Sequence, residues 1–255
     1  MVILASFTED RAAFGLSELS RALRMSKATL LRILWTLSHH GIVRQREEDR
    51  AFVLGPELVR LGTLALNHSG LLEVCRRHLR RLQALTEETV CLFVRTGRDR
   101  LCVDVAPSQH ELRITINVGA TRPLHAGAAG KVLLAFMPED EARRIVCGRP
   151  LEAITERTLT DGMQLLRQLK DIRARRVAVS EGEAVRGAAA IATPILDKDG
   201  GVVAAVNVLG PRLHLTPARI HRLIPAVVAA AETMSEELGH ISRPMRKTAR
   251  RSSET

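Results

Sequence analysis

Two short amphipathic segments, separated by three residues, constrain the N-terminal fold most strongly. Residues 16–23 carry leucines at spacings of three and four, so a helix there has one apolar face. Residues 24–26 break this pattern, and Ser26 is a favourable N-cap because its hydroxyl can accept from a free amide two or three residues on. A second helix then covers about residues 27–38, and Gly41 ends it. Two helices joined by so short a break predict a helix-turn-helix.

A hairpin follows the second helix. Residues 42–46 and 51–54 are strand-like, and the charged residues 47–50 form the turn between them. Two helices and then a wing form the arrangement in which the second helix enters the major groove of DNA. We therefore expect a winged helix-turn-helix DNA-binding domain over residues 1–55.

The distribution of charge supports this interpretation. The formal net charge is +10, and residues 19–46 hold six basic side chains and no acidic one. A second excess lies in residues 243–255, with five basic residues and one acidic residue. A charge run is usually a solvated face, but that does not explain the missing acids, whereas a local basic stripe is the footprint expected for DNA.

The outward residues of the second helix and the basic residues of the wing are the DNA-binding candidates. On an arbitrary helix they would be ordinary solvent-facing residues, but the first two turns of a reading helix reach bases and phosphates. The wing arginines fit phosphate or minor-groove contacts. The candidates are Ser26, Lys27, Ala28, Thr29, Arg32, Arg44, Arg46 and Arg50.

The rest of the chain predicts a linker helix and a mixed α/β domain. Proline at position 56 and recurring leucines favour a linker helix within residues 56–70. Residues 71–240 then alternate between segments with a helical pattern of apolar residues and segments with a strand-like pattern, which indicates an α/β domain. We expect helices at 71–87, 126–136, 138–146, 162–175 and 217–239, and strands at 89–94, 100–105, 112–116, 189–195 and 202–208. The basic residues 241–255 are expected to be a disordered tail.

Several classes of protein are disfavoured. No apolar run approaches the ~18 residues that span a bilayer, and the N-terminus lacks a basic region and a cleavage signature, so we expect a cytoplasmic protein. The four cysteines lie singly, without zinc or dithiol spacing, and are interpreted as buried thiols. We find no nucleophile with a base, no carboxylate pair and no metal-ligand spacing among the scattered histidines, and therefore expect no enzyme, no cofactor and no metal site.

The small residues 127–131 leave two interpretations open. The segment resembles a phosphate-binding loop, but His125 stands where the first glycine is needed and Val132 where a hydroxyl is needed. The small residues either let the start of a helix approach a ligand, whose carboxylate its free amides would hold, or allow tight packing of the helix on a sheet.

Four blocks of sequence together resemble the IclR-type transcriptional regulators over nearly the whole chain. The first is the helix-turn-helix, residues 16–20 and 25–34, followed by Leu37 and Gly41. The others are residues 52–58, then 123–135 with 155–158, and finally 187–194 with 206–211. The blocks occur in order and at spacings similar to those of that family.

The resemblance implies a GAF-like effector-binding domain with a cavity on one side of its sheet, and a homodimer or tetramer. It places nine residues in the cavity lining: Ile114, Ile116, Ala128, Ala129, Ser180, Ala188, Ala190, Asn207 and Leu209. This lining is mostly apolar, so a bound anion would be held chiefly by backbone amides near residue 126. A small hydrophobic or aromatic carboxylate fits better than a polar sugar acid, whose hydroxyls would lack partners.

The chain departs from the family pattern in three places. The first expected helix lies close to residue 1, so we expect either that part of the family's N-terminal stretch is missing or that the start site is assigned too late. Arg176 and Val177 replace a frequent Gly-Tyr pair, and Ala190 stands where cysteine is common. Because the last two changes lie around the cavity, the effector is not transferred by analogy.

The sequence thus predicts an α+β protein of two domains, a sequence-specific DNA-binding regulator under control of a small-molecule effector. Operator DNA, the effector and further copies of the chain are its expected partners, without a membrane. The alternatives are an architectural DNA-binding protein without an effector and, less favoured, an enzyme on the C-terminal domain.

Overall fold

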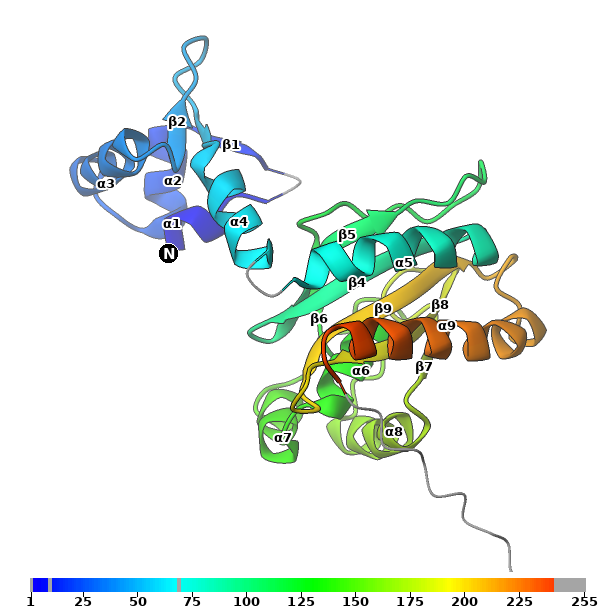
Figure 1. The fold of residues 1–255 in the computed structure, drawn as a ribbon. Coiled ribbons are helices and arrows are strands. Elements are labelled where there is room, and N and C mark those ends of the chain that lie inside the picture. Colours follow the sequence, from blue (N-terminus) through cyan, green and yellow to red (C-terminus); the bar gives the residue numbers. More distant parts are fainter. Residues whose placement is uncertain (1, 9–10, 68–69, 241–255) are drawn as a thin grey trace, which may run out of the picture. The chain divides into compact units, whose positions relative to one another are not determined.

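The protein consists of two compact units, residues Met1–Leu71 and Leu72–Thr255, and each is described by itself. The structure is a computed structural model that describes residues 2–8, 11–67 and 70–240 (Figure 1). The tail predicted at 241–255 lies outside these residues.

The N-terminal unit is a winged helix-turn-helix. Its helices are α1 (Val2–Ala5), α2 (Leu16–Leu23), α3 (Lys27–His39) and α4 (Glu57–Asn67), and its strands are β1 (Ala13–Phe14), β2 (Val43–Gln45) and β3 (Phe52–Leu54). The strands pair in the order β1-β3-β2. This confirms the two predicted helices and the hairpin, while α1 and β1 were not predicted because each is too short to show a period.

A small apolar core holds α2 and α3 together. Leu19 of α2 and Leu30 and Leu34 of α3 are fully buried. The turn between the helices is set by Arg24, which adopts a left-handed backbone conformation at the end of α2. Ser26 then caps α3, and its hydroxyl accepts a hydrogen bond from the amide of Thr29. The capping predicted for Ser26 is therefore present.

The larger unit is built on one six-stranded antiparallel sheet of order β6-β5-β4-β9-β8-β7. Helices α5 and α9 lie side by side over one face, and α6 and α8 lie on the other (Figure 1). The strands are β4 (Thr89–Thr96), β5 (Asp99–Ala106), β6 (Thr121–Pro123), β7 (Ala178–Glu181), β8 (Ala188–Leu196) and β9 (Val202–Pro211). The helices are α5 (Leu71–Thr86), α6 (Ala128–Phe136), α7 (Glu139–Cys147), α8 (Gly162–Arg175) and α9 (Pro217–Glu237).

One predicted strand is wrong. Residues 112–116 form no strand, and the short strand β6 pairs with β5 instead. The alternation that suggested a strand is real, because Ile114 and Ile116 both pack against the main core. In place of a backbone ladder, the hydroxyl of Thr89 donates to the carbonyl of Ile114 at 2.9 Å. One-sided burial therefore produced a strand-like pattern in an irregular segment. Strand β7 was not predicted.

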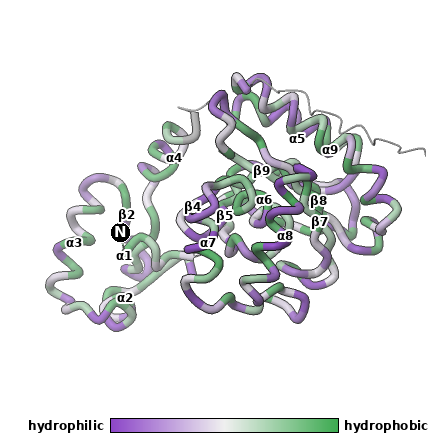
Figure 2. Tube along the Cα trace, turned by 90° about the horizontal axis from the view of Figure 1, so that it is seen from below, coloured by the Kyte–Doolittle hydropathy of each residue, from purple (hydrophilic) through white to green (hydrophobic). Residues whose placement is uncertain are grey.

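Small side chains allow α6 to lie close to the sheet. Ala188, Ala190 and Ala192 of β8 belong to the core that α6 shares, and a Cβ at Gly130 would overlap the carbonyl group of Leu124. Helix α6, which is mostly hydrophobic, lies in the interior of the larger unit (Figure 2). The tight packing that was one of two interpretations of residues 127–131 is thus present.

Three of the four cysteines are buried, as predicted, but Cys147 is exposed. It is the last residue of α7, where the helix leaves the core, so the expectation of burial is wrong for this thiol. Burial raises the pKa of Cys75 to about 12, and the pKa of Cys91 is raised by its hydrogen bond with Cys102 and by burial. None of the described helices is long and apolar enough to cross a membrane.

Because the thiolate is the reactive form, we expect the native protein to react with an aromatic disulfide reagent at one thiol per chain. Cys147→Ser should abolish this fast reaction, whereas Cys75→Ser should leave it unchanged. Thiol release measured at pH 8, before and after denaturation, checks both. Fast release of more than one thiol from the folded protein would contradict the buried positions.

Candidate nucleic-acid interface and ligand cavity

The N-terminal half of α3 presents the predicted reading residues to solvent. Ser26, Lys27, Ala28, Thr29 and Arg32 are all exposed, and the buried leucines of the same helix hold it from behind. The Ser26 hydroxyl is already used by the cap, and it also bonds the hydroxyl of Thr29 at 2.9 Å. The surface available to a partner therefore consists mainly of two cations and the small groups between them.

The basic side chains differ in how far they are already paired. Lys27, Arg32, Arg44 and Arg50 make no side-chain hydrogen bond or ion pair with any residue that the structure describes. Arg46 instead binds Asp49 across the wing turn at 2.5 Å. A backbone hydrogen bond from Ala51, together with Arg46, lowers the pKa of Asp49. Arg46 thus stabilises the turn of the wing, and the other four cations remain available to bind an anion.

Trp35 is an exposed residue of α3 that the sequence analysis did not use. Its side chain is 71 % exposed, and Leu31, one turn earlier, is also exposed. A large exposed aromatic residue beside unpaired cations is a candidate contact for a partner. The sequence did indicate that Trp35 is exposed, because it falls outside the apolar period of the helix.

Eight of the nine residues predicted for the effector site line one cavity of the larger unit. They are Ile116, Ala128, Ala129, Ser180, Ala188, Ala190, Asn207 and Leu209. Ile114 is not in the lining and packs against the core instead. The cavity measures about 390 Å³ when its open mouth is counted, but the centres of water-sized molecules have only about 40 Å³.

A buried arginine also lines this cavity, and the sequence analysis missed it. Arg100 of β5 is 6 % exposed, and its Nη1 donates to the carbonyl oxygens of Pro123, at 2.9 Å, and Ala126. Its Nε is buried without a hydrogen-bond partner among the described residues. Burial lowers the pKa of Arg100 to about 10, so the side chain is still a cation at neutral pH.

The cavity also holds an unpaired acceptor. The Oδ1 atom of Asn207 on β9 is buried and has no hydrogen-bond partner within the described ranges. Buried polar atoms are normally hydrogen-bonded, so each exception calls for an explanation. A donor and an acceptor, both unpaired, on two strands of one cavity are a pair of groups that a ligand could satisfy.

The start of α6 is already occupied by a carboxylate of the protein. Glu183 accepts from the amide of Gly127 at 3.2 Å and from the Nζ atom of Lys131 at 2.5 Å. Lys131 is 1 % exposed, and its Nζ also donates to Gln168. The amide of Gly127, one of those predicted to hold a bound anion, is therefore already paired with Glu183, and the cavity also contains the cation of Arg100.

Both charged residues left signals in the sequence. Arg100 precedes Cys102 by two positions in a predicted strand, so it shares the buried face of that strand. Glu183 lies just after β7, six residues beyond Val177, where the departure from the family pattern was noted. A charge on the inward face of a strand is the signal that could have identified Arg100.

Comparisons with known proteins agree with this architecture. The sequence model described as the IclR helix-turn-helix domain matches residues 1–47, and the one described as the bacterial transcriptional regulator IclR C-terminal matches residues 63–236. The chain is 34 % identical over 220 residues to the HTH-type transcriptional regulator BhcR of Paracoccus denitrificans, covering 86 % of this chain and 79 % of that protein. It is 31 % identical to the HTH-type transcriptional regulator KdgR of Escherichia coli, covering 95 % of this chain and 92 % of that protein.

Solved structures give the same picture. A putative IclR transcriptional regulator from Silicibacter sp. TM1040 superimposes with a TM-score of 0.87 at 29 % identity, covering 95 % of this chain and 96 % of that one. An IclR homologue from Microbacterium hydrocarbonoxydans, solved in complex with 4-hydroxybenzoate, superimposes with a TM-score of 0.78 at 27 % identity, covering 92 % and 95 %.

The Lys131–Glu183 pair leads to a testable prediction about stability. Removing one member of a buried ion pair strands the other charge, so Lys131→Met should lower the free energy of unfolding by ~3–5 kcal/mol. The double variant Lys131→Met with Glu183→Gln strands no charge and should recover much of this loss. Urea unfolding of the single and double variants checks the coupling, and simply additive losses would contradict it.

Proposed function

Since this chain belongs to the IclR family of bacterial transcriptional regulators, we propose that it binds operator DNA through α3 and the wing. A small carboxylate bound in the cavity of the larger unit would determine whether that DNA is released or retained. The observation that carries the DNA-binding part is the set of exposed, unpaired cations on α3 and the wing. The cavity with Arg100 and Asn207 carries the effector part.

We assign the functional parts of the chain as follows. Residues 1–55 form the DNA-binding domain, 56–70 the linker helix, and 71–240 the effector-binding domain, with 241–255 as a basic tail. Since its ligand is chromosomal DNA, the protein works in the bacterial cytoplasm. We assign it no catalytic role, because the relatives that it matches are named as regulators.

Within the DNA-binding domain, Lys27, Thr29 and Arg32 would reach base edges, because they lie on the first turns of the reading helix. Arg44 and Arg50 would contact phosphates from the wing. Arg46 would act mainly on the shape of the wing, since its charge is shared with Asp49. Ser26 and Ala28 would set how closely the helix start approaches the backbone of the DNA.

The protein would act as a homodimer, or as a pair of dimers, with two reading helices about one turn of DNA apart. Support comes from α4, whose apolar residues Val59, Leu61 and Leu64 are exposed. Pairing of two such helices would bury these side chains and join two DNA-binding domains.

The effector would be a small carboxylate that also carries a hydrogen-bond donor. Arg100 would take the carboxylate through its unpaired Nε, and Asn207 would accept from a hydroxyl or amine of the same molecule. The relative from Microbacterium hydrocarbonoxydans holds 4-hydroxybenzoate, which has both groups. Apart from Ser180 and Glu183, the rest of the lining is apolar or glycine, which disfavours sugar acids, since most of their further hydroxyls would stay unpaired.

The size of the cavity limits the effector. Free space of about 40 Å³ is room for about three water molecules, so a ring-sized ligand must displace part of the lining. Ile116 lies on the irregular segment between β5 and β6, which has few backbone hydrogen bonds to hold it. Movement of this segment would both admit the ligand and carry the signal away from the cavity.

The proposed reading surface is tested by comparing two arginine variants on two DNAs. The wild-type protein should prefer the DNA upstream of its own gene over random DNA by ~10³-fold or more. Arg32→Ala should lose ~1–3 kcal/mol on that DNA and little on random DNA, because it removes a base contact. Arg44→Ala should weaken both, because phosphates are present in both.

Fluorescence anisotropy at fixed salt measures these affinities. Arg143→Ala on α7 is the matched control, since it removes an exposed arginine outside the N-terminal unit and should change neither affinity. Equal losses for Arg32→Ala and Arg44→Ala on both DNAs would refute the division between base and phosphate contacts. Lack of any preference by the wild type would favour the architectural alternative.

The effector site is tested by Asn207→Leu, which keeps the branching of the side chain at Cγ and removes the unpaired acceptor. We expect the free energy of unfolding to stay level or rise by up to ~1–3 kcal/mol, because no hydrogen bond within the protein is lost. The response to added carboxylates should disappear. Thermal shift and operator release are measured with 4-hydroxybenzoate, benzoate and short aliphatic carboxylates.

Thr193→Val is the matched control, because Thr193 lies on β8 with its side chain toward α9, away from the cavity. It should keep the wild-type response. If Asn207→Leu is less stable than wild type and still responds, Asn207 is a structural residue and the effector site lies elsewhere.

A further inference from the structure

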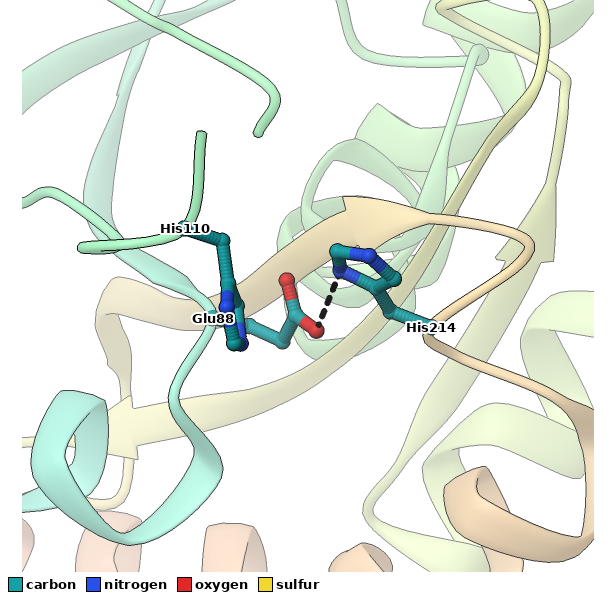
Figure 3. Close-up of side chains that lie close together, drawn as sticks. All are labelled: Glu88, His110 and His214. Atoms are coloured by element: carbon teal, nitrogen blue, oxygen red, sulfur yellow. Dashed lines mark ion pairs between the residues drawn. The ribbon is translucent and has the colours of Figure 1, made fainter. Parts of the chain in front are cut away.

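Three residues from separate parts of the chain meet at one end of the larger unit. Glu88 lies between α5 and β4, His110 in the segment after β5, and His214 in the turn between β9 and α9 (Figure 3). One possible ligand atom from each lies within 4.8 Å of the other two. The two imidazole rings are 5.0 Å apart between centroids and inclined by 64°.

The carboxylate of Glu88 is buried, and only one of its two oxygens has a partner among the described residues. Glu88 has no exposed surface, and its Oε1 lies 3.3 Å from Nη1 of Arg219 and 3.2 Å from Nδ1 of His214. Its Oε2 has no hydrogen-bond partner among the described residues, and Nδ1 of His214 also lacks one of acceptable geometry. A buried carboxylate oxygen without a partner is strongly unfavourable, which points to a ligand that binds here.

The surrounding backbone fixes the three residues in place. The Ser108 hydroxyl donates to the carbonyl of Glu87 at 2.6 Å and accepts from the amide of His110 at 3.2 Å. The amide of His214 donates to the carbonyl of Pro211 at 2.9 Å. A Cβ at position 210 would overlap Oε2 of Glu88, so Gly210 provides the space that this carboxylate occupies.

Two imidazoles and one carboxylate, held by a rigid backbone, are the donor set of a zinc site with one open position. We propose that Glu88, His110 and His214 bind one Zn²⁺ ion per chain, with water as a fourth ligand. Ligand atoms of tetrahedral zinc lie about 3.3 Å apart, so the side chains must draw together by roughly 1 to 1.5 Å. His214 is partly exposed, with 22 % of its side chain in solvent, and leaves a route for the ion.

Arg219 is the group that opposes a cation here. Its guanidinium also donates to the carbonyl of Thr86 at 2.7 Å and lies 3.6 Å from Glu87, so its charge is shared among several acceptors. It reaches only Oε1 of Glu88, and Oε2 stays free for the metal. A closed cluster of arginine, glutamate and histidine would leave no such oxygen unpaired.

Bound zinc would tie the segment after β5 to the end of β9. That segment carries Ile116, and β9 carries Asn207 and Leu209, all of which line the cavity. The metal would therefore restrain one wall of the cavity against another. This site stands apart from the proposed effector site, because none of its three ligands lines the cavity.

Local spacing along the chain predicted no metal site. The three residues are far apart in the chain, and no short motif joins them. Their meeting depends on the pairing of β4 with both β5 and β9.

The test uses the tag-free full-length protein, stripped of metal with a chelator and titrated with Zn²⁺ at pH 7.5. Calorimetry should show one site per chain, and the melting temperature should rise with zinc concentration. His110→Gln and His214→Gln should each weaken zinc binding more than tenfold, because even loss of an outer-shell partner costs about tenfold or more. His221→Gln, an exposed histidine outside the cluster, should bind as the wild type does.

Co²⁺ provides a spectroscopic readout of the same site. The wild type and His221→Gln should show the intense visible absorption of four-coordinate cobalt, and the His110 and His214 variants should not. Each histidine variant is first checked for a cooperative melting transition without metal. A wild type that binds no Zn²⁺ at micromolar concentration, or folded His110 and His214 variants that bind as tightly as wild type, would overturn the proposal.

Discussion

The larger unit depends on the close approach of α6 to the central sheet. Alanines at alternate positions of β8 let α6 pack closely on the sheet, and Gly130 in the helix lets the backbone at Leu124, just before the helix, lie against it. Their small volume also leaves space beside the start of the helix, where the cavity lies. The carboxylate of Glu183 compensates the positive dipole end of the helix start through the amide of Gly127, and the ammonium of Lys131 pairs with that carboxylate. The close packing of α6 on the sheet thus determines the core, the cavity and the buried charges together.

In the N-terminal unit, one side of α3 packs on the core and the opposite side is exposed to a partner. Buried leucines on one side of α3 fix its position on α2, and the opposite side carries cations that nothing in the described chain neutralises. Acidic residues are absent from the same stretch of sequence, so no neighbour competes with a polyanion. In the wing, by contrast, Arg46 and Asp49 neutralise each other, which gives that turn a defined shape.

Local patterns predicted local structure well, and non-local chemistry poorly. The period of the leucines located α2 and α3, and Ser26 marked the start of α3, because caps and periods are properties of neighbouring residues. Eight cavity positions came from family resemblance rather than from the physics of the sequence. Residues 112–116 were misassigned because alternation reports which side is buried, and a strand also needs a partner strand. The cluster of Glu88 with two histidines was missed because it forms only when distant strands pair, whereas Arg100 was missed although its inward position on a predicted strand was a signal.

The alanine stripe on β8 has a consequence for how such a sensor diverges. Each of Ala188 and Ala190 touches the cavity through one methyl group, while the backbone behind them is paired on both sides by β7 and β9. In the effector site proposed above, exchanging these methyl groups for other side chains would change the chemical selectivity of the cavity and leave the backbone pairing of β8 intact. DNA recognition, which resides on a separate folding unit, is untouched by such an exchange. In this architecture, mutations that change which effector is bound and mutations that change which operator is recognised would therefore fall in different units of the chain.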